Sequence, residues 1–381
     1  MVSTLHELDQ WLPGTGTGDG PGNAWWAFPS EEHPRLLISC DASGWACGLG
    51  FVASRWRREF LKQRLRLDRF RKRAPSLSRA AFQLPDPIHR LWESKAANLA
   101  VYFGTASRFS KMTIAVLDTD GKVLGYVKHS RSTDAEVAIR NEAAALRKLR
   151  SLFPDETCFP RLLAEGDDWS VQSPASPGGG SKPAWQAGRI LALLATEGVV
   201  DEPWCTCASR RFLMESAGSL ENQGRPDLAA RVVRMVACLD SAGSGRSVVS
   251  CLSHGDFAPW NLSDAVGGFA YDWEWFGVRP RLHDAFHYLW FAYISSRRRL
   301  TRRHLESIVK GSDGSEIGKH VGWPGSEELA FLAALYAAQS FTFYVGHSVA
   351  GGDEPNDFPF VSRLEIMVEQ FTNEGVRSDD E

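Results

Sequence analysis

One segment in the second half of the chain constrains the fold more than any other. Residues 252–275 read LSHGDFAPWNLSDAVGGFAYDWEW. Asn261 follows Asp256 by five residues, so both side chains can project from a single tight loop. The glycine pair at 267–268 favours a hairpin that would bring Asp272 back beside Asn261. The segment therefore predicts a loop, a short hairpin and a cluster of oxygen-bearing side chains.

Such a cluster suits phosphoryl transfer, which needs a carboxylate near the attacking hydroxyl and oxygen ligands for a metal ion on the phosphates. Asp256 can supply that carboxylate, and Asn261 and Asp272 can supply ligands for a hard cation such as Mg²⁺. Taken alone, His254, Asp256 and Asn261 are also ordinary residues of a surface loop. The spacing of the asparagine and the following Asp-Trp-Glu favour the chemical interpretation, because one mechanism then accounts for every position.

The segment resembles the aminoglycoside phosphotransferase and choline kinase superfamily, whose fold is protein-kinase-like. The catalytic loop of that superfamily reads H-G-D-x-x-x-x-N and its metal-binding motif is typically I-D-W-E, where this chain has HGDFAPWN and YDWE. The resemblance implies that Asp256 accepts or orients the proton of the substrate hydroxyl and that His254 supports the loop. It also implies that Asn261 and Asp272 bind Mg²⁺.

The same resemblance gives a bracing role to Asp284, which opens the expected helix RLHDAFHYLW. The match is strong around the motifs, weaker but in the right order over residues 101–200, and absent before them. A glycine-rich phosphate loop is not found, so Thr105 and Ser107 are the candidates for contacts to phosphate oxygens, although a plain turn explains them equally well. By resemblance alone, the adenine is expected beside residues 195–198.

Residues 101–200 follow the order of a kinase small lobe. A strand in VYFGTASRFS, a hairpin in MTIAVLDTDGKVLGYVKHS, and further strands in CFPRLLAEGDD and AGRILALLATEG predict a five-stranded antiparallel sheet. The linker SVQSPASPGGGSKPAW before the last strand is expected to be an exposed hairpin loop. One helix is expected after the first hairpin, beginning at Thr133 in a capping box with Glu136.

That helix, TDAEVAIRNEAAALRKLRSLF, places Glu142 on its apolar stripe between Ile139 and Leu146. A buried carboxylate needs a cation beside it, and Lys128 at the end of the preceding strand is the natural partner. Kinase-like sites use such a lysine to meet the nucleotide phosphates and such a glutamate to hold the lysine. The alternative is a glutamate at the edge of the stripe and an unrelated surface lysine. Lys128 and Glu142 are therefore the expected ATP-binding pair.

The flanking regions complete the expected organisation. Residues 1–100 are expected to form an N-terminal extension with a hairpin over residues 35–54 and a basic amphipathic helix over 55–73. Residues 201–381 are expected to form a large, mostly helical lobe that carries the catalytic loop and the acceptor site. The predicted fold class is thus α+β, a protein-kinase-like two-lobed fold whose nucleotide-binding small lobe occupies residues 101–200.

Composition and charge argue against other classes of protein. Residues 55–73 hold ten lysines and arginines against two acids, but the chain as a whole carries a net charge of −3, which disfavours a nucleic-acid binder. The basic segment can contact a membrane surface or a polyanion, although packing on the rest of the protein is the simpler interpretation. Neither a transmembrane run nor a secretory signal is found, so a cytoplasmic location is expected. The seven scattered cysteines indicate reduced thiols, and Cys205 and Cys207 lack a second pair at zinc-site spacing.

Together the patterns predict an ATP- and Mg²⁺-dependent phosphotransferase that moves the γ-phosphoryl group to a hydroxyl of a small molecule or sugar. The alternative is a weak or inactive nucleotide-binding scaffold, which the poor phosphate loop favours. A protein kinase is disfavoured because no D-F-G or A-P-E follows the catalytic loop. Aromatic faces for a sugar or an amino alcohol are offered by four tryptophans, of which at least three are expected to be core residues: Trp260, Trp273, Trp275 and Trp290.

Overall fold

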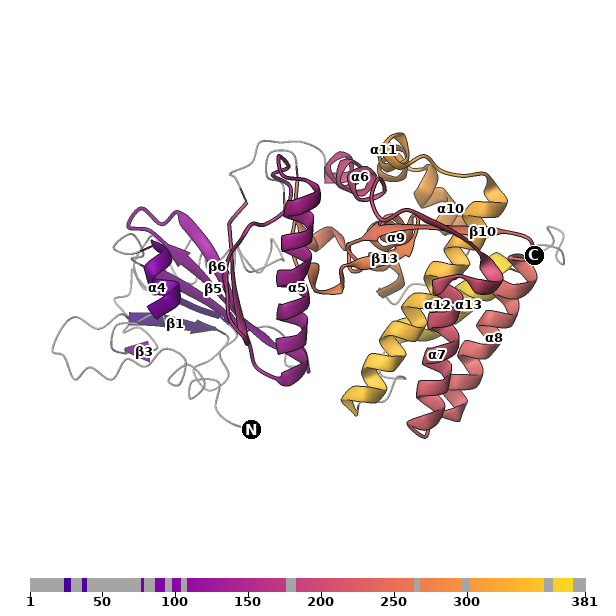
Figure 1. The fold of residues 1–381 in the computed structure, drawn as a ribbon, viewed down its shortest axis with the longest axis horizontal. Helices are drawn as coiled ribbons and strands as arrows, with labels where there is room; N and C mark the ends of the chain where they lie inside the picture. Colours follow the sequence, from indigo (N-terminus) through magenta and orange to yellow (C-terminus); the bar gives the residue numbers. More distant parts are fainter. Residues whose placement is uncertain are drawn as a thin grey trace. The chain divides into compact units, whose positions relative to one another are not determined.

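A large antiparallel sheet and a set of helices form the two compact parts of the chain (Figure 1). The computed structural model describes residues 24–28, 36–39, 77–78, 86–92, 98–103, 108–175, 183–263, 268–295, 302–352 and 359–372. The first part, here the sheet unit, comprises residues 1–176, and the second, the helical unit, comprises residues 177–381. The expected α+β fold class is confirmed, with the sheet and most of the helices separated along the chain.

The sheet unit is built on eight strands that pair antiparallel in the order β3-β1-β2-β4-β5-β6-β8-β7. The strands are β1 Ala24–Phe28, β2 Leu36–Ser39, β3 Leu77–Ser78, β4 Asn98–Phe103, β5 Lys111–Leu117, β6 Val123–Ser130, β7 Leu162–Glu165 and β8 Trp169–Gln172. Four of these strands, β4 to β7, lie in segments where strands were predicted, whereas β8 falls at the start of the segment predicted as a linker.

The strands that the structure describes within residues 1–100 do not form the separate extension that was predicted for this region. Its strands β1, β2 and β3 continue the same sheet, because β2 pairs with β4 along Leu36–Ile38 and with β1 on its other side. The prediction that β2 forms a hairpin with the residues directly after it, within 35–54, is therefore wrong. Both edges of β2 are already paired, one with the earlier strand β1 and the other with the later strand β4. The rest of that hairpin and the basic helix predicted over residues 55–73 lie outside the described residues.

Two helices pack on opposite faces of this sheet (Figure 1). The short α4, Asp86–Trp92, covers one face, where Ile88 lies in the core cluster with Val127 of β6. The long α5, Thr133–Leu152, packs on the face reached by Lys128, the next residue of β6. The side chain that caps α5 is Ser132, whose hydroxyl accepts from the Ala135 amide at 3.2 Å. The predicted capping box of Thr133 and Glu136 is therefore wrong, because the cap lies one residue earlier and Ala135, three residues after it, has no side chain that could complete a box.

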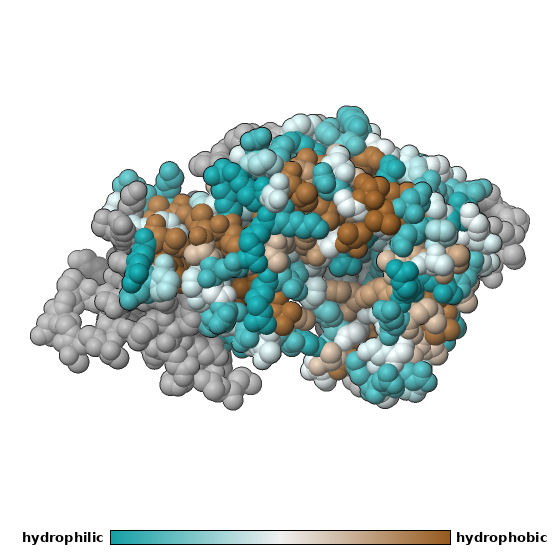
Figure 2. All heavy atoms as spheres, in the orientation of Figure 1, coloured by the Kyte–Doolittle hydropathy of each residue, from teal (hydrophilic) through white to brown (hydrophobic). Residues whose placement is uncertain are grey.

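The helical unit contains most of the helices. They are α6 Pro183–Leu194, α7 Ala208–Asn222, α8 Pro226–Ala242, α9 His283–Ser295, α10 Arg302–Lys310, α11 Ser312–Val321, α12 Ser326–Gly351 and α13 Pro359–Thr372. Side chains at the turn that joins α7 to α8 are polar, as the space-filling view shows (Figure 2). The helical periodicity predicted for the regions of α8, α12 and α13 is confirmed.

Short strands in this unit carry the motif loop between helices. A three-stranded antiparallel sheet consists of β9 Val200–Pro203, β10 Ser247–Ser253 and β13 Gly277–Pro280, with β10 in the centre. The hairpin strands β11 Leu262–Ser263 and β12 Phe269–Ala270 lie between β10 and β13 in sequence. The short 3-10 turns η2 Trp204–Thr206, η3 Pro259–Asn261 and η4 Trp273–Trp275 complete the connections.

The prediction of a strand in AGRILALLATEG is wrong, because this segment forms most of α6. Its buried side chains recur at helical spacing, as Ala184, Ala187, Ile190 and Leu194 show. The preceding linker is accordingly no hairpin loop, because it leads from β8 to a helix of the second unit. The division between the units therefore falls at residue 176, earlier than the boundary predicted at residue 200.

The core helix of the helical unit is α12, whose residues from Ala330 to Thr342 are all buried. By length and mean hydropathy it is the one helix of the described chain that would suit a membrane span. Its most apolar window is 78% buried within the protein, which is the behaviour of a helix packed among other helices. It packs against α13, α8, α7 and α9.

Candidate active site

In the sheet unit, Lys128 and Glu142 form the predicted ion pair. The ammonium nitrogen of Lys128 donates to both carboxylate oxygens of Glu142, at 2.7 and 2.9 Å. Their side chains are only 8% and 1% exposed. Ile139, Leu146 and Leu149 are buried beside Glu142 on the same stripe of α5, so an unpaired charge here would be costly. The surface-lysine alternative is excluded, while the role of the pair toward a nucleotide stays a prediction.

In the helical unit, the motif loop begins where β10 ends, and Asp284 holds its first turn. One carboxylate oxygen of Asp284 accepts from the amide of His254 at 2.6 Å, and the other accepts from the amide of Gly255 at 3.0 Å. Asp284 lies in the first turn of α9 and is 4% exposed. A buried carboxylate that accepts two backbone amides is a strong local restraint. Its contacts are those of the bracing residue that the sequence predicted.

Gly255 has a backbone requirement that explains its place between His254 and Asp256. Its φ is 87°, in the left-handed region that side chains disfavour. A Cβ atom at this position would lie 2.3 Å from the carbonyl oxygen of Trp275. The glycine therefore permits both the turn and the close approach of the segment that carries Asp272.

Asp256 follows this turn with its carboxylate partly open to solvent, at 32% exposure of the side chain. The side-chain nitrogen of Asn261 donates to the Asp256 carbonyl at 2.8 Å and to its carboxylate oxygen Oδ2 at 3.1 Å. The Asp256 amide donates to Nδ1 of His254 at 3.3 Å. Thus both neighbours predicted from the motif fix the orientation of the aspartate.

His254 ties the loop to the hairpin that precedes Asp272. Its Nε2 lies 2.6 Å from the carbonyl oxygen of Tyr271, and its Nδ1 accepts the Asp256 amide, so the neutral ring carries its proton on Nε2. The ring is fully buried and packs 4.4 Å from that of Trp273. A supporting role for His254 is consistent with these contacts.

The predicted hairpin brings Asp272 back along the backbone of Asn261. Strands β11 and β12 pair Leu262 with Ala270, and the Tyr271 amide donates to the Asn261 carbonyl at 2.9 Å. Asp272 has a φ of 62°. Left-handed backbone at a residue other than glycine is uncommon and is often found at functional sites.

Asn261 and Asp272 fit the donor set of a magnesium ion. The amide nitrogen of Asn261 makes both contacts to Asp256, so its side-chain oxygen is the atom left for a cation. Carboxylate and amide oxygens are the ligand types that Mg²⁺ takes, usually one or two from the protein beside water and phosphate. No cluster of three His, Cys, Asp or Glu that would hold a metal by itself occurs in the described part of the chain. The two protein ligands, Asn261 and Asp272, thus suit a Mg²⁺ ion that is also coordinated by phosphates.

One further residue contacts the aspartate and a second holds that residue, and the sequence analysis missed both roles. Nε2 of His287, on α9, lies 3.0 Å from Oδ1 of Asp256, close but not aligned as a hydrogen bond. The hydroxyl of Tyr336, on α12, lies 3.2 Å from Nδ1 of His287. Both side chains are buried, at 3% and 1% exposure. The motif gives no signal for them, because they come from helices brought together by packing.

Buried charges surround the base of the loop. Burial lowers the pKa of the Arg279 guanidinium, while the charges of Asp284 and Asp256 oppose that shift. Burial also lowers the pKa of His283 well below its ordinary value, and the charges of Arg279 and His287 act in the same direction. Arg279 therefore contributes positive charge near both carboxylates, and it too was missed.

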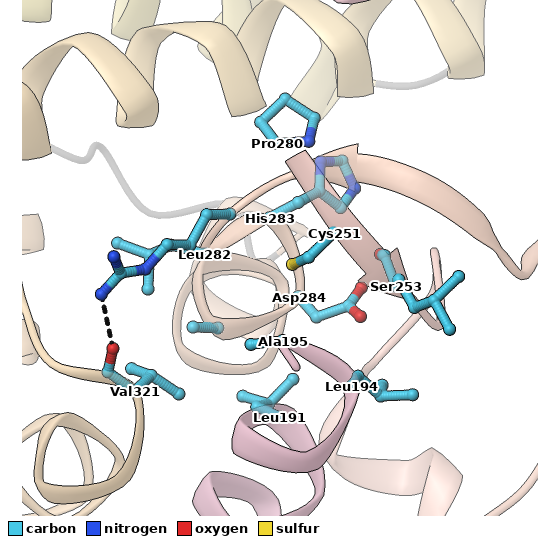
Figure 3. Close-up of a pocket in the computed structure, with 13 residues that line it drawn as sticks. Leu191, Leu194, Ala195, Cys251, Ser253, Pro280, Leu282, His283, Asp284 and Val321 are labelled. Carbon is cyan, nitrogen blue, oxygen red and sulfur yellow. Dashed lines mark hydrogen bonds between the residues drawn. The ribbon is translucent and has the colours of Figure 1, made fainter. Parts of the chain in front are cut away.

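A small cavity lies behind the loop, between α6, β10 and the start of α9 (Figure 3). Its volume is about 30 Å³, which is enough to hold water. The carboxylate of Asp284 points toward Ser253 at its wall (Figure 3). Burial raises the pKa of the Cys251 thiol in this wall to about 11, and Asp284 adds to the shift.

Two predictions about the nucleotide cannot be carried over as stated. Thr105 and Ser107, the predicted phosphate contacts, lie outside the described residues. Residues 195–198, where the adenine was expected, follow a helix and not the last strand of the small lobe, so the strand edge that motivated this placement is missing.

No family model matches the sequence, and a search of curated proteins returns no match. Solved structures, however, are similar to it. An aminoglycoside phosphotransferase bound to ADP is 13% identical with a TM-score of 0.47, over 75% of this chain and 97% of that one. A macrolide 2′-phosphotransferase from Brachybacterium faecium is 15% identical with a TM-score of 0.46, over 77% and 98%. A spectinomycin phosphotransferase bound to ADP and spectinomycin is 10% identical with a TM-score of 0.47, over 75% and 96%.

The chain resembles small-molecule phosphotransferases. All three structures are of phosphotransferases, with TM-scores below 0.5. At identities of 10% to 15% the likeness is at most one of fold. The function of this chain therefore has to be inferred from its own side chains.

Proposed function

We propose that the protein is an ATP- and Mg²⁺-dependent phosphotransferase that transfers the γ-phosphoryl group to a hydroxyl of a small molecule. The observation that carries the proposal is the state of Asp256. Its carboxylate remains 32% exposed, while Asn261 and the turn braced by Asp284 fix its position. A fixed, accessible carboxylate is what is needed to orient an attacking hydroxyl and to take its proton.

The other residues have matching roles in this proposal. Asn261 and Asp272 would hold Mg²⁺, which neutralises charge on the phosphates when it is bound. Lys128, held by Glu142, would meet the phosphates of the nucleotide. Transfer requires both sets of residues to act on one nucleotide, and the following experiment tests that requirement.

Purified protein is incubated with ATP and Mg²⁺ against a panel of sugars, amino alcohols, aminoglycosides, macrolides and nucleosides, and phosphorylated products are detected by mass spectrometry. Asp256→Asn is the control, because it keeps the shape of the side chain and loses its basicity. We expect one class of acceptor to be phosphorylated by the parent protein only. Equal product with Asp256→Asn, or ATP turnover that persists in EDTA, would contradict the proposed chemistry.

Nucleotide binding is measured separately by calorimetry with Mg²⁺ and with EDTA. Binding that depends on Mg²⁺ in the parent protein and loses this dependence in Asp272→Asn supports the metal assignment. ATP binding without transfer to any acceptor would instead identify a nucleotide-binding scaffold.

A further inference from the structure

Beside Asp256, six aromatic side chains from five elements form a connected surface, here called the aromatic platform. It consists of Trp260, Trp275, Phe291, Phe343, Tyr344 and Phe360. The ring centroids of Trp275 and Phe343 are 4.7 Å apart, and those of Phe343 and Tyr344 are 5.3 Å apart. Tyr344 lies 5.7 Å from Phe291, which lies 5.7 Å from Trp260.

The platform differs in exposure from the aromatic core of the same unit. Trp273 and Trp290 are 0% and 1% exposed, as core residues should be. Trp260 is 53% exposed and Trp275 is half-buried, so two of the four motif-region tryptophans lie in the core, where at least three were expected. The five other members of the platform are only half-buried. Contiguous apolar surface that remains exposed is commonly a site where ligands or partners bind.

The platform adjoins the proposed catalytic carboxylate at several points. The ring of Phe291 stacks on that of His287 at 4.5 Å, and His287 lies against Asp256. Burial raises the pKa of Tyr344, and the charge of Asp256 adds to the shift, which places that phenol within electrostatic reach of the carboxylate. The carbonyl of Trp275 packs on Gly255, next to Asp256 in the chain.

The geometry of the rings argues against an ammonium cage. A cage must leave room for a cation about 6 Å or less from the face of each of several rings. Here Trp275 touches Phe343 edge to face at 4.7 Å, and Tyr344 touches Phe360 edge to face at 4.9 Å. The rings fill the space between one another and present a continuous surface.

Charge argues in the same direction. Helix α12 has no Asp or Glu from residue 329 to its end, and α9 has none after Asp284, whose carboxylate is occupied by the loop. On α13, Glu365 already pairs with Arg231 at 2.6 Å. Among the described residues, the further acidic side chains on the platform's elements are Glu369 on α13 and Glu274 beside Trp275. The described helices of the platform therefore offer a polycationic acceptor few partners, whereas a neutral molecule needs none.

We propose that the aromatic platform binds the acceptor through a flat, uncharged, apolar face, an aryl ring or the apolar face of a sugar, and presents a hydroxyl of that molecule to Asp256. The proposal rests on the phosphotransferase function proposed above. It favours neutral hydroxylated acceptors over aminoglycosides and over amino alcohols.

The test compares four probes in binding experiments without nucleotide: 4-nitrophenyl β-D-glucopyranoside, glucose, kanamycin and choline. Saturation-transfer NMR identifies which protons contact the protein, and calorimetry gives the affinity. We expect the aryl glucoside to bind more tightly than glucose, which has hydroxyls but no aryl ring, with saturation strongest at its ring protons. Tighter binding of kanamycin or choline, or no detectable binding of the aryl glucoside at millimolar concentration, would overturn the proposal.

Variants then locate the binding site. Trp260→Ala should weaken the aryl glucoside by roughly two- to tenfold, the range of one aromatic stacking contact, and Trp260→Phe should restore most of the affinity. Phe212→Ala is the matched control, because Phe212 is an exposed ring on α7 outside the platform, at 39% exposure. Equal effects of Trp260→Ala and Phe212→Ala would remove the platform from the binding site.

The two proposals fail in different ways. If the aryl glucoside binds in a Trp260-dependent way but no acceptor is phosphorylated, the proposed role of the platform stands and the proposed phosphotransferase function is contradicted. If kanamycin or choline is phosphorylated and neutral planar acceptors are not, the phosphotransferase function stands and the proposed role of the platform is overturned.

Discussion

The two candidate half-sites handle charge in opposite ways. In the sheet unit, Lys128 and Glu142 neutralise one another in an almost fully buried pair. In the helical unit, Asp256 is about one-third exposed, and its neighbours orient it with hydrogen bonds. Among the described residues, no lysine or arginine forms a salt bridge with it. The first arrangement neutralises a buried charge within the fold, whereas the second leaves an accessible carboxylate that can take part in a reaction.

This difference predicts which variants should lose stability and which should lose activity. A buried pair that loses one partner leaves an uncompensated charge, so the free energy of unfolding should fall. A partly exposed carboxylate can be replaced by its amide at little structural cost. The four predictions below test this separation.

The largest effect is expected at Asp256. Asp256→Asn should lower turnover by about 10²- to 10⁴-fold, because a positioned base contributes on that scale. The midpoint of urea unfolding should stay close to that of the parent protein, since the amide can still accept the contact from Asn261. If Asp256→Asn unfolded at a clearly lower urea concentration but kept its activity, Asp256 would be a structural residue, which is the opposite of the role given to it here.

At the buried pair the expected loss is in stability. Lys128→Met should lower the free energy of unfolding of the sheet unit by about 3–5 kcal/mol, because Glu142 then loses its buried cation. The double variant with Glu142→Leu should recover much of this loss, since no charge is then buried. Lys122→Met, at an exposed lysine between β5 and β6, is the matched control. If the single and double variants unfold at the same urea concentration, the pair is not a structural element.

Asp284 should affect both properties, because it is buried and yet braces the catalytic loop. Asp284→Asn keeps one acceptor oxygen but turns an amide donor toward a backbone amide, which should cost about 1–3 kcal/mol of stability and lower turnover as well. Urea unfolding and a turnover assay measure the two effects. Asp227→Asn, on the exposed start of α8, should change neither, and a similar response at both sites would argue against the bracing role.

The smallest effect is expected at His287, which touches Asp256 from outside the motif. His287→Leu should lower kcat by roughly two- to tenfold with little change in ATP affinity, because one polar contact to the carboxylate is lost. His287→Gln can still donate from a similar position and should be closer to the parent. Identical kcat in the leucine and glutamine variants would show that His287 acts only through packing.

Local spacing explains how much of the site could be predicted from the sequence. Asp256 and Asn261 meet because they share one short loop, and Glu142 is buried because α5 repeats its apolar residues at helical spacing. The hairpin before Asp272 followed from turn residues. In each case the geometry is set by a few neighbouring residues.

The errors in the prediction have the same physical origin. A short apolar run such as that of α6 fits a buried strand as well as a helix, and only its neighbours in the fold decide between them. Of the strands β1 to β3, only β2 lies in a segment that was predicted to be extended, and it was assigned to a separate hairpin. Local sequence does not specify which strand will pair with which.

The sequence by itself determined the loop, its aspartate and the residues that hold it, because hydrogen bonds within one loop depend on spacing along the chain. Only the tertiary structure decided that His287 lies against that aspartate and that Tyr336 and the aromatic platform contact His287. These side chains come from helices far apart in sequence, and their meeting depends on which apolar faces pack together.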